Sequence, residues 1–374
     1  MKDKFSISLV WGWLRSALNS MLVPVLAVFT ALVMGGIIIA MVGGNPFNAY
    51  LGLFQGAFGS AKAWSETAVW ATPYIFAGLA VGVAFKGGLF NIGAEGQLAL
   101  GAVFSAWVGY ALPDALGFDL PAIIHIPLAV GFGMLAGTLW AAIPGALKAY
   151  MGGHEVINTI MMNYIALNLT SFLLNGAMKD PSPTNVIART PAIAMSARIP
   201  PLMEGLRVHW GFVLALVVAG LVWWVLWKTK VGFEIRTVGA NPDAARYAGM
   251  DVRNIIVLTM AFSGMLAGLA GSIEVTALNY RHELGFSIGY GFDAIAIALL
   301  GKTHPLGIVL AAILFGGMRN GATRMQFLTQ IPTDVISVIQ ALVLLFVAAD
   351  AIIRYIYRIR AREERVVLTR GWGG

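Results

Sequence analysis

The sequence contains no cysteine, which excludes disulfide bonds, iron–sulfur clusters and thiol catalysis. Charged residues are also scarce: they make up 11% of the chain, whereas soluble domains normally have about 25%. Because 58% of the residues are hydrophobic, the chain cannot cover itself with polar surface. We therefore expect it to fold in a lipid bilayer.

The sequence also lacks the residue patterns of metal sites and enzymes. The histidines are scattered without ligand spacing, so no metal site is predicted. We find no Ser, His and Asp order, no paired-carboxylate cleft and no GxGxxG after a strand. Gly301-Lys302-Thr303 resembles the end of an ATP-binding Walker A loop, but Ala296 stands where that motif requires glycine. We predict a chain that is not an enzyme and binds no cofactor itself.

Apolar blocks of about 20 residues recur along the chain, the length that an α-helix needs to cross a bilayer. The blocks lack the alternation of barrel strands, so we predict an all-α integral membrane protein, with one transmembrane domain over 1–374. About ten helices are expected, at 21–42, 69–85, 93–112, 123–146, 156–175, 209–227, 254–276, 287–301, 304–319 and 332–354. The eighth and ninth are short and glycine-rich, so discontinuous helices are the alternative there.

The basic residues indicate a topology rather than a nucleic-acid-binding surface, because they stand in loops and tails beside apolar blocks. An even number of spans puts both termini on one side of the membrane. That side is cytoplasmic by the positive-inside rule, since both ends of the chain are basic. The basic residues of the two ends are Lys2, Lys4, Arg15, Arg354, Arg358, Arg360, Arg362, Arg365 and Arg370.

Two connections are long enough to have functions of their own, an external loop at 176–208 and a cytoplasmic loop at 228–253. The external loop contains five prolines, at 181, 183, 191, 200 and 201, which exclude one continuous helix. It is either a docking surface for an outside partner or a simple connector.

Within the cytoplasmic loop, the run from Asn241 to Gly249 has the pattern of a short, capped helix. Asn241 is a good N-cap, Asp243 opposes the positive end of the helix dipole, and Gly249 can end the helix in a left-handed conformation. Ala244 and Tyr247 share one face with Ala248, because they lie three and four residues apart. This face either fits a groove of a partner protein or covers the chain's own helices.

A second polar run, Gly88 to Gln97, interrupts apolar sequence with glycines and predicts a broken helix. Polar groups at membrane depth face either protein or a water-filled path, which makes Asn91, Glu95 and Gln97 candidates for the translocation path. The structural alternative is that Asn91 caps the following helix and Glu95 lies in its first turn.

A third polar group of residues lies within or beside later spans. Asn163 and Asn168 are five residues apart and therefore lie about 140° apart around a helix, on different faces. They either join helices by hydrogen bonds or line a polar path, and the same two roles are open for Asp293, Glu274 and Asn279.

At these stretches the sequence resembles the permease subunits of bacterial ABC importers in the branched-chain amino acid and ribose permease group, and most closely the nucleoside branch. The resemblance is in the runs GLFNIGAEGQ at 88–97, EVI with MMNYIA within 155–166, and GANPDAARYAGM at 239–250, and it extends over about 60–350. In this family the third run is the coupling helix that the ATPase receives, which implies that role for Asp243, Ala244, Ala245 and Gly249. Asp243 stands where many importers have Glu, and His154 where Asn is expected.

The resemblance implies a type II importer fold and a permease subunit for nucleosides or related simple sugars, in a bacterial cytoplasmic membrane. The implied partners are a second permease, an ATPase that binds ATP and magnesium, and an extracytoplasmic substrate-binding protein. An ion-coupled secondary transporter is the alternative, since Glu95 and Asp293 are acidic residues in apolar sequence.

Overall fold

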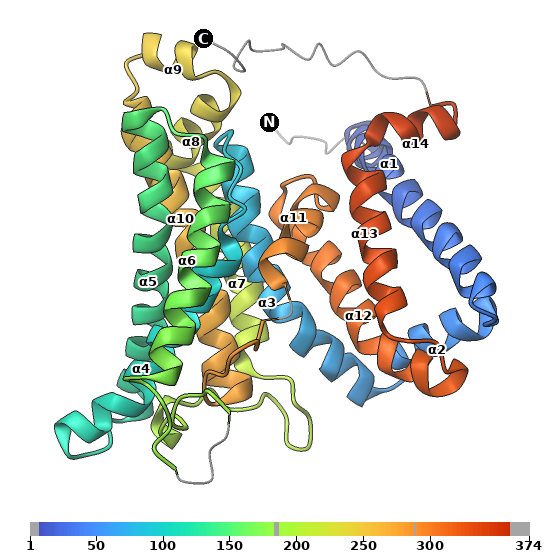
Figure 1. Cartoon of the computed structure of the whole chain (residues 1–374). Coiled ribbons are helices and arrows are strands. Elements are labelled where there is room, and N and C mark those ends of the chain that lie inside the picture. Colours follow the sequence, from blue (N-terminus) through green and yellow to red (C-terminus); the bar gives the residue numbers. More distant parts are fainter. Residues whose placement is uncertain (1–6, 183–186, 288, 360–374) are drawn as a thin grey trace. The chain divides into compact units, whose positions relative to one another are not determined.

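The computed structural model describes residues 7–182, 187–287 and 289–359, which form helices joined by turns and loops (Figure 1). Within these residues the only β-type pairings are two isolated bridges, Arg189 with Glu283 and Pro201 with His209. The predicted all-α architecture is thus confirmed. Pro183, Lys2, Lys4 and the arginines from Arg360 onward lie outside the described residues.

Eight helical segments among the described residues are long and apolar enough to cross a membrane. They are Leu22–Met41 within α1 (Ile7–Met41), α3 (Ala61–Lys86), α4 (Ala94–Leu116), α5 (Ala122–Met151), α6 (Glu155–Asn175), α7 (Trp210–Lys228), Val252–Asn279, which joins α10 (Val252–Ile273) to the π-helical turn η2 (Glu274–Asn279), and α12 (Pro305–Thr329). The predicted number of about ten is not confirmed.

The two other expected spans, 287–301 and 332–354, correspond to shorter helices. α11 (Tyr290–Leu300) has 11 residues and is about 17 Å long, little more than half of the hydrocarbon thickness. Gly289, with φ +91°, and Gly301 lie at its two ends. In the last expected span α13 (Asp334–Ala348) ends before Ala349, and α14 (Asp350–Ile356) is a separate short helix.

Several helices extend beyond the apolar blocks, because polar residues near a helix end can still be helical. α3 begins at Ala61 rather than near 69. Ser60 is its N-cap and accepts a hydrogen bond from the backbone N–H of Ala63. α12 continues to Thr329, ten residues beyond the expected end. The short helices α2 (Pro46–Phe58) and α8 (Lys230–Ala240) are additional.

The chain forms two compact units. One comprises the described residues up to Leu53 together with those from Ala322 to Ile359. Its core includes Val23, Ala27 and Ile353, with Phe346 and Tyr357 packed against them. α1 also packs on α13, so that a β-carbon on Gly35 would lie 2.6 Å from the side chain of Ile339.

The second unit, Phe54–Gly321, contains α3 to α11. α10 packs between α4 and α5 at contacts made by glycine. A β-carbon added to Gly268 would lie 2.4 Å from the carbonyl oxygen of Gly133, and one added to Gly101 would lie 2.4 Å from the carbonyl oxygen of Gly268. Such small residues let membrane helices approach backbone to backbone.

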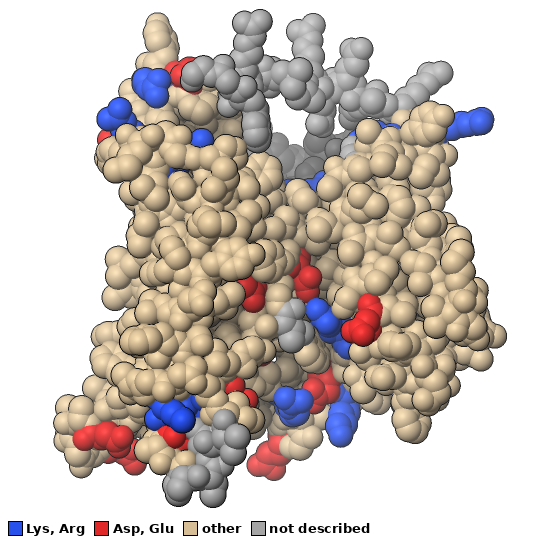
Figure 2. Space-filling view, in the orientation of Figure 1, with Lys and Arg blue, Asp and Glu red and all other residues tan. Residues whose placement is uncertain are grey.

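The surface of α5 has the character of a lipid-facing helix. Figure 2 shows charged side chains toward the ends of the part formed by α5 and α6, and an uncharged band between them. Large apolar side chains are exposed on α5 every three or four residues, at Ile124, Leu128, Phe132, Leu135, Leu139 and Ile143. We conclude that the chain is a multi-pass membrane protein.

Candidate functional site

The first candidate site is the short helix α9 (Pro242–Tyr247), at one end of the second unit (Figure 1). The side-chain oxygen of Asn241 accepts hydrogen bonds from the backbone N–H groups of Asp243 and Ala244, at 3.0 Å each. Gly249, with φ +82°, adopts the left-handed conformation that glycine tolerates best. The sequence therefore predicts this local structure correctly, from N-cap to terminating glycine.

α9 presents one face outward and one inward. Tyr247 is 96% exposed, and Ala244 and Ala248 beside it are also exposed. Ala245 is fully buried against the chain itself. The expected outward face thus exists, but Ala245 can only support the helix from behind, because its side chain does not reach the surface.

α9 is attached to the bundle through α8, which rests on the turn between α3 and α4. A β-carbon on Gly239 would lie 2.2 Å from the carbonyl oxygen of Lys86, so only glycine fits at this crossing. Arg236 donates a hydrogen bond of 2.9 Å to the carbonyl oxygen of Leu226 at the end of α7. On the other side Asp251 caps α10 by accepting from the N–H of Asn254. α9 is therefore connected to α7 and α3 through α8, and it leads directly into α10.

The second candidate, the broken segment before α4, is a closed network of hydrogen bonds. Asn91 and Gln97 bond to each other twice, at 2.9 and 3.0 Å. Asn91 also donates to Ser263 of α10 at 2.8 Å. Asn163 of α6 accepts from the N–H of Gly96 at 2.8 Å. Since Asn91, Gln97 and Asn163 are at most 3% exposed, these side chains join α4, α6 and α10 in this conformation.

Glu95 makes a further connection between helices. Its carboxylate accepts from the backbone N–H of Gly291 at 2.6 Å and from the hydroxyl of Ser287. It is 5% exposed and links the first turn of α4 to the start of α11. Glu95 lies in the first turn of α4, as the structural alternative expected, but the N-cap position belongs to Gly93 and not to Asn91. The side chain of Asn91 accepts a hydrogen bond from the backbone N–H of Gly93 at 3.0 Å. For these residues a role in the translocation path stays a prediction.

The two other path candidates form no hydrogen bond with these side chains among the described residues. Asn168 is on an exposed face of α6 and donates to the carbonyl oxygen of Tyr164. Asp293 of α11 accepts from the Tyr74 hydroxyl at 2.7 Å and is paired with Arg319 of α12 at 3.6 Å. Both charged side chains of this pair are 24% exposed, so Asp293 is more accessible than Glu95, the other acidic residue predicted for the path, which is 5% exposed.

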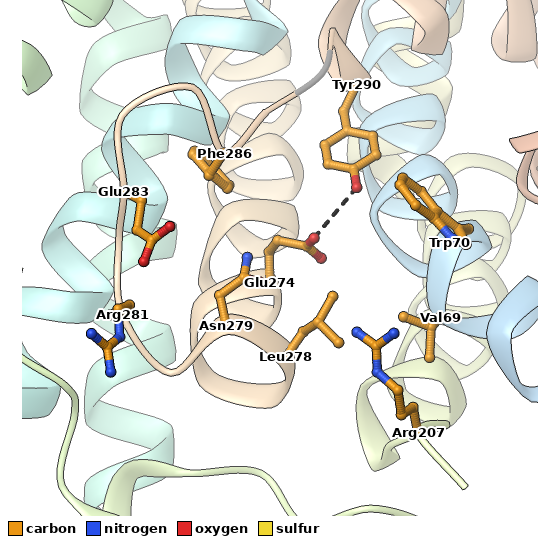
Figure 3. A pocket seen from close by; sticks show the side chains of 10 residues that line it. All are labelled: Val69, Trp70, Arg207, Glu274, Leu278, Asn279, Arg281, Glu283, Phe286 and Tyr290. Atoms are coloured by element: carbon orange, nitrogen blue, oxygen red, sulfur yellow. Dashed lines mark hydrogen bonds between the residues drawn. The ribbon is translucent and has the colours of Figure 1, made fainter. Parts of the chain in front are cut away.

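A third candidate is a pocket of about 260 Å³, shown in Figure 3. Its walls come from α3, from η2, and from Arg207, Arg281, Glu283, Phe286 and Tyr290. The aromatic side chains of Trp70, Phe286 and Tyr290 surround the carboxylate of Glu274, which is 4% exposed. The hydroxyl of Tyr290 donates to this carboxylate at 3.4 Å. The pocket is close to the lower size limit of small-molecule sites, at about 300 Å³.

The pocket owes its shape to the π-helical turn. η2 carries Glu274 and Asn279 and ends at Tyr280, whose φ of +55° is in the left-handed region. π-helical turns are rare in proteins, but those that occur are often found at functional sites. The acidic and amide residues of this turn stood out in the sequence, but Trp70, Arg207 and Tyr290 did not, because no local pattern relates them to Glu274.

Comparison with known proteins decides the family. The family described as "Branched-chain amino acid transport system / permease component" matches residues 63–348. The chain belongs to this family. The resemblance noted in the sequence is therefore confirmed.

Three relatives match almost the whole chain. The guanosine ABC transporter permease protein NupP of Bacillus subtilis is 42% identical over 91% of this chain and 96% of that protein. The nucleoside ABC transporter permease protein NupB of Lactococcus lactis is 36% identical over 90% of this chain and 92% of its own length. The glucose ABC transporter permease protein TsgB13 of Haloferax volcanii is 35% identical over 91% of this chain and 90% of its own length.

The first two organisms each have a second, more distant relative with the same transport description, NupQ and NupC, both 29% identical to this chain. No solved structure shows a significant match. The chain is accordingly a membrane-spanning permease subunit of an ABC transporter and not a catalytic subunit.

Proposed function

We propose that this permease imports nucleosides or related simple sugars, driven by ATP hydrolysis on a partner ATPase that docks on α9. The observation that carries the coupling role is the outward face of α9: a capped helix outside the apolar spans with Tyr247 96% exposed. A small-sided helix with one aromatic residue suits a groove of another protein. ATP and magnesium are bound by the ATPase, and this chain binds no cofactor.

The substrate class follows from the relatives. Two of the three most similar relatives reported above are described as permeases for guanosine or nucleosides, and the third as a permease for glucose. The paired descriptions of NupP with NupQ and of NupB with NupC support a second, different permease as the partner in the membrane. An extracytoplasmic binding protein delivers the substrate.

In this proposal α9 faces the cytoplasm of a bacterial cell, and both chain termini lie on the same side of the cytoplasmic membrane. The pocket at Glu274 then opens on the outer side, because α10 leads from the α9 end to η2. Its 22 residues extend over about 33 Å, close to the thickness of the hydrocarbon core.

Two neighbouring alanines test the coupling role. The complex of both permeases with the ATPase is purified in detergent and reconstituted, and substrate-stimulated ATP hydrolysis and uptake are measured. Ala244→Leu alters only the exposed face, so we expect lower stimulation and uptake with an unchanged thermal midpoint. Ala245→Leu fills a buried position and is expected to lower the thermal midpoint as well.

Unchanged substrate-stimulated ATP hydrolysis and uptake in Ala244→Leu would refute the docking proposal. A folded chain that never retains an ATPase would also reject it. Transport by the isolated chain under an ion gradient would instead support an ion-coupled transporter.

A further inference from the structure

We propose that the pocket at Glu274 binds the base of a 6-oxopurine nucleoside, such as guanosine or inosine, and that Glu274 accepts hydrogen bonds from the N1–H edge of this base. The inference rests on the proposed import of nucleosides and adds the part of the substrate that this chain itself recognises. It concerns a site distinct from α9 and from the hydrogen-bonded network around Asn91.

The walls of the pocket suit a flat, apolar ring. Trp70, Phe286 and Tyr290 contribute aromatic surface, and Val69 and Leu278 add apolar surface beside them (Figure 3). The rings of Trp70 and Tyr290 have centroids 6.5 Å apart and are inclined by 57°, so they form adjacent walls. Bases bind to aromatic side chains by stacking.

Glu274 is the group in the pocket that can recognise an edge of the ring. A carboxylate that is 4% exposed needs hydrogen-bond donors, because burial without them is costly. Among the described residues, the Tyr290 hydroxyl is the one donor to this carboxylate, at the long distance of 3.4 Å. Two arginines line the pocket, Arg207 and Arg281. The guanidinium of Arg207 pairs with Glu66 at 2.9 Å, and among the described residues neither arginine forms an ion pair with Glu274. The carboxylate therefore has acceptor capacity left for a ligand.

The chemistry of the base then selects among nucleosides. In hypoxanthine and guanine the ring nitrogen N1 carries a hydrogen, and guanine adds a 2-amino group beside it. A carboxylate can accept from both of these donors. Adenine has an unprotonated N1 at the same position, which would face the carboxylate as a second acceptor. Selection between an N–H donor and a bare nitrogen is strong when the protein group is buried.

The outer part of the pocket suits the sugar. Asn279 is exposed at the end of η2, and Glu283 lies on the chain that follows. Their amide and carboxylate groups can bond hydroxyl groups of a ribose without burying charge. A free monosaccharide can donate hydroxyl groups to these residues and to Glu274, but it lacks a flat ring that stacks on the aromatic walls, so ribose serves as the competitor in the test.

The test is uptake by the reconstituted complex of guanosine, inosine and adenosine, with ribose as a competitor. Wild-type protein is expected to prefer guanosine and inosine to adenosine and to be insensitive to ribose. Glu274→Gln removes the charge but keeps the shape, and should lower the guanosine-to-adenosine uptake ratio about tenfold, the effect of losing one charge-assisted hydrogen bond. Glu204→Gln, at an exposed glutamate outside the pocket, should leave the ratio unchanged.

A ratio is used because a partly misfolded variant lowers uptake of all nucleosides alike. Trp70→Leu should reduce uptake of every nucleoside, whereas Trp64→Leu on the same helix should not, since Trp64 does not line the pocket. An unchanged ratio in Glu274→Gln, in a complex that transports guanosine, overturns this inference alone. A complex that transports sugars but no nucleoside overturns the nucleoside proposal and this inference together, and competition by ribose assigns the pocket to sugars.

Discussion

Replacing Tyr247 by alanine tests the proposed contact between α9 and the ATPase. The tyrosine is 96% exposed on α9 and contributes little to folding. We expect the free energy of unfolding to change by less than about 0.5 kcal/mol, as for other surface substitutions away from special features. The affinity of the ATPase for the permease should fall.

The size of the loss follows from the exposed area. A fully covered tyrosine removes about 150 to 250 Å² from water, which at about 25 cal/mol per Å² corresponds to roughly 4 to 6 kcal/mol as an upper limit. Alanine retains part of this contact. Truncating an aromatic anchor at an interface typically weakens the binding free energy by about 2 kcal/mol or more. We therefore expect the dissociation constant to rise about 30-fold.

The assay is titration of the purified ATPase onto permease in lipid nanodiscs, followed by substrate-stimulated ATP hydrolysis. Tyr247→Phe keeps the ring and should bind nearly as well as wild type, while Tyr247→Ala binds weakly. Equal affinities for all three proteins would refute the reasoning, because a side chain so exposed cannot then be covered by the partner.

Two further predictions concern stability. Gly268→Ala should lower the free energy of unfolding by about 1 to 3 kcal/mol, because its β-carbon would lie 2.4 Å from a carbonyl oxygen of α5. Gly131→Ala is the matched control, with no atom within 4 Å of the new carbon, and thermal denaturation in detergent compares the two. Burial lowers the pKa of His282, which lies outside the spans, to about 3, whereas the unfolded chain takes up this proton near pH 6.5. The contribution of His282 to the free energy of unfolding should thus be fully present above pH 6.5 and should be lost as the pH decreases toward 3. A variant His282→Asn whose thermal midpoint depends on pH as strongly as that of wild type would contradict this.

The membrane fold could be predicted from the sequence because hydrophobic length is a local property. The blocks at 123–146 and 156–175 lie within α5 and α6, and the block at 209–227 begins one residue before α7. Prediction was weakest where glycine and short apolar runs meet, as at α11, since an 11-residue helix has the same composition as part of a full span. Whether such a helix crosses the bilayer depends on what packs around it.

The candidate sites differ in the same way, because one is formed by residues adjacent in the chain and the others by residues far apart. α9 was predictable because its cap, its first-turn acid and its terminating glycine are adjacent in the chain. The network joining Asn91 to Ser263, and the pocket joining Trp70 to Glu274, depend on residues that are 172 and roughly 200 positions apart. No local pattern of residues relates such pairs, so sequence alone offered only the individual polar residues within apolar runs.

The course of α10 gives these separate features one physical connection. It begins three residues after Gly249, where α9 has ended, and it continues into η2 at Glu274. Along its length it packs on α4 and α5 at glycine contacts that leave no room for an added β-carbon, so it can shift only together with those helices or by sliding past them. If a partner displaces α9 as proposed, we expect the displacement to be passed to the π-helical turn, which carries the carboxylate of the pocket. We therefore expect the occupancy of the pocket and the position of α9 to depend on each other, because a ligand that favours one geometry of η2 also favours the matching position of α10.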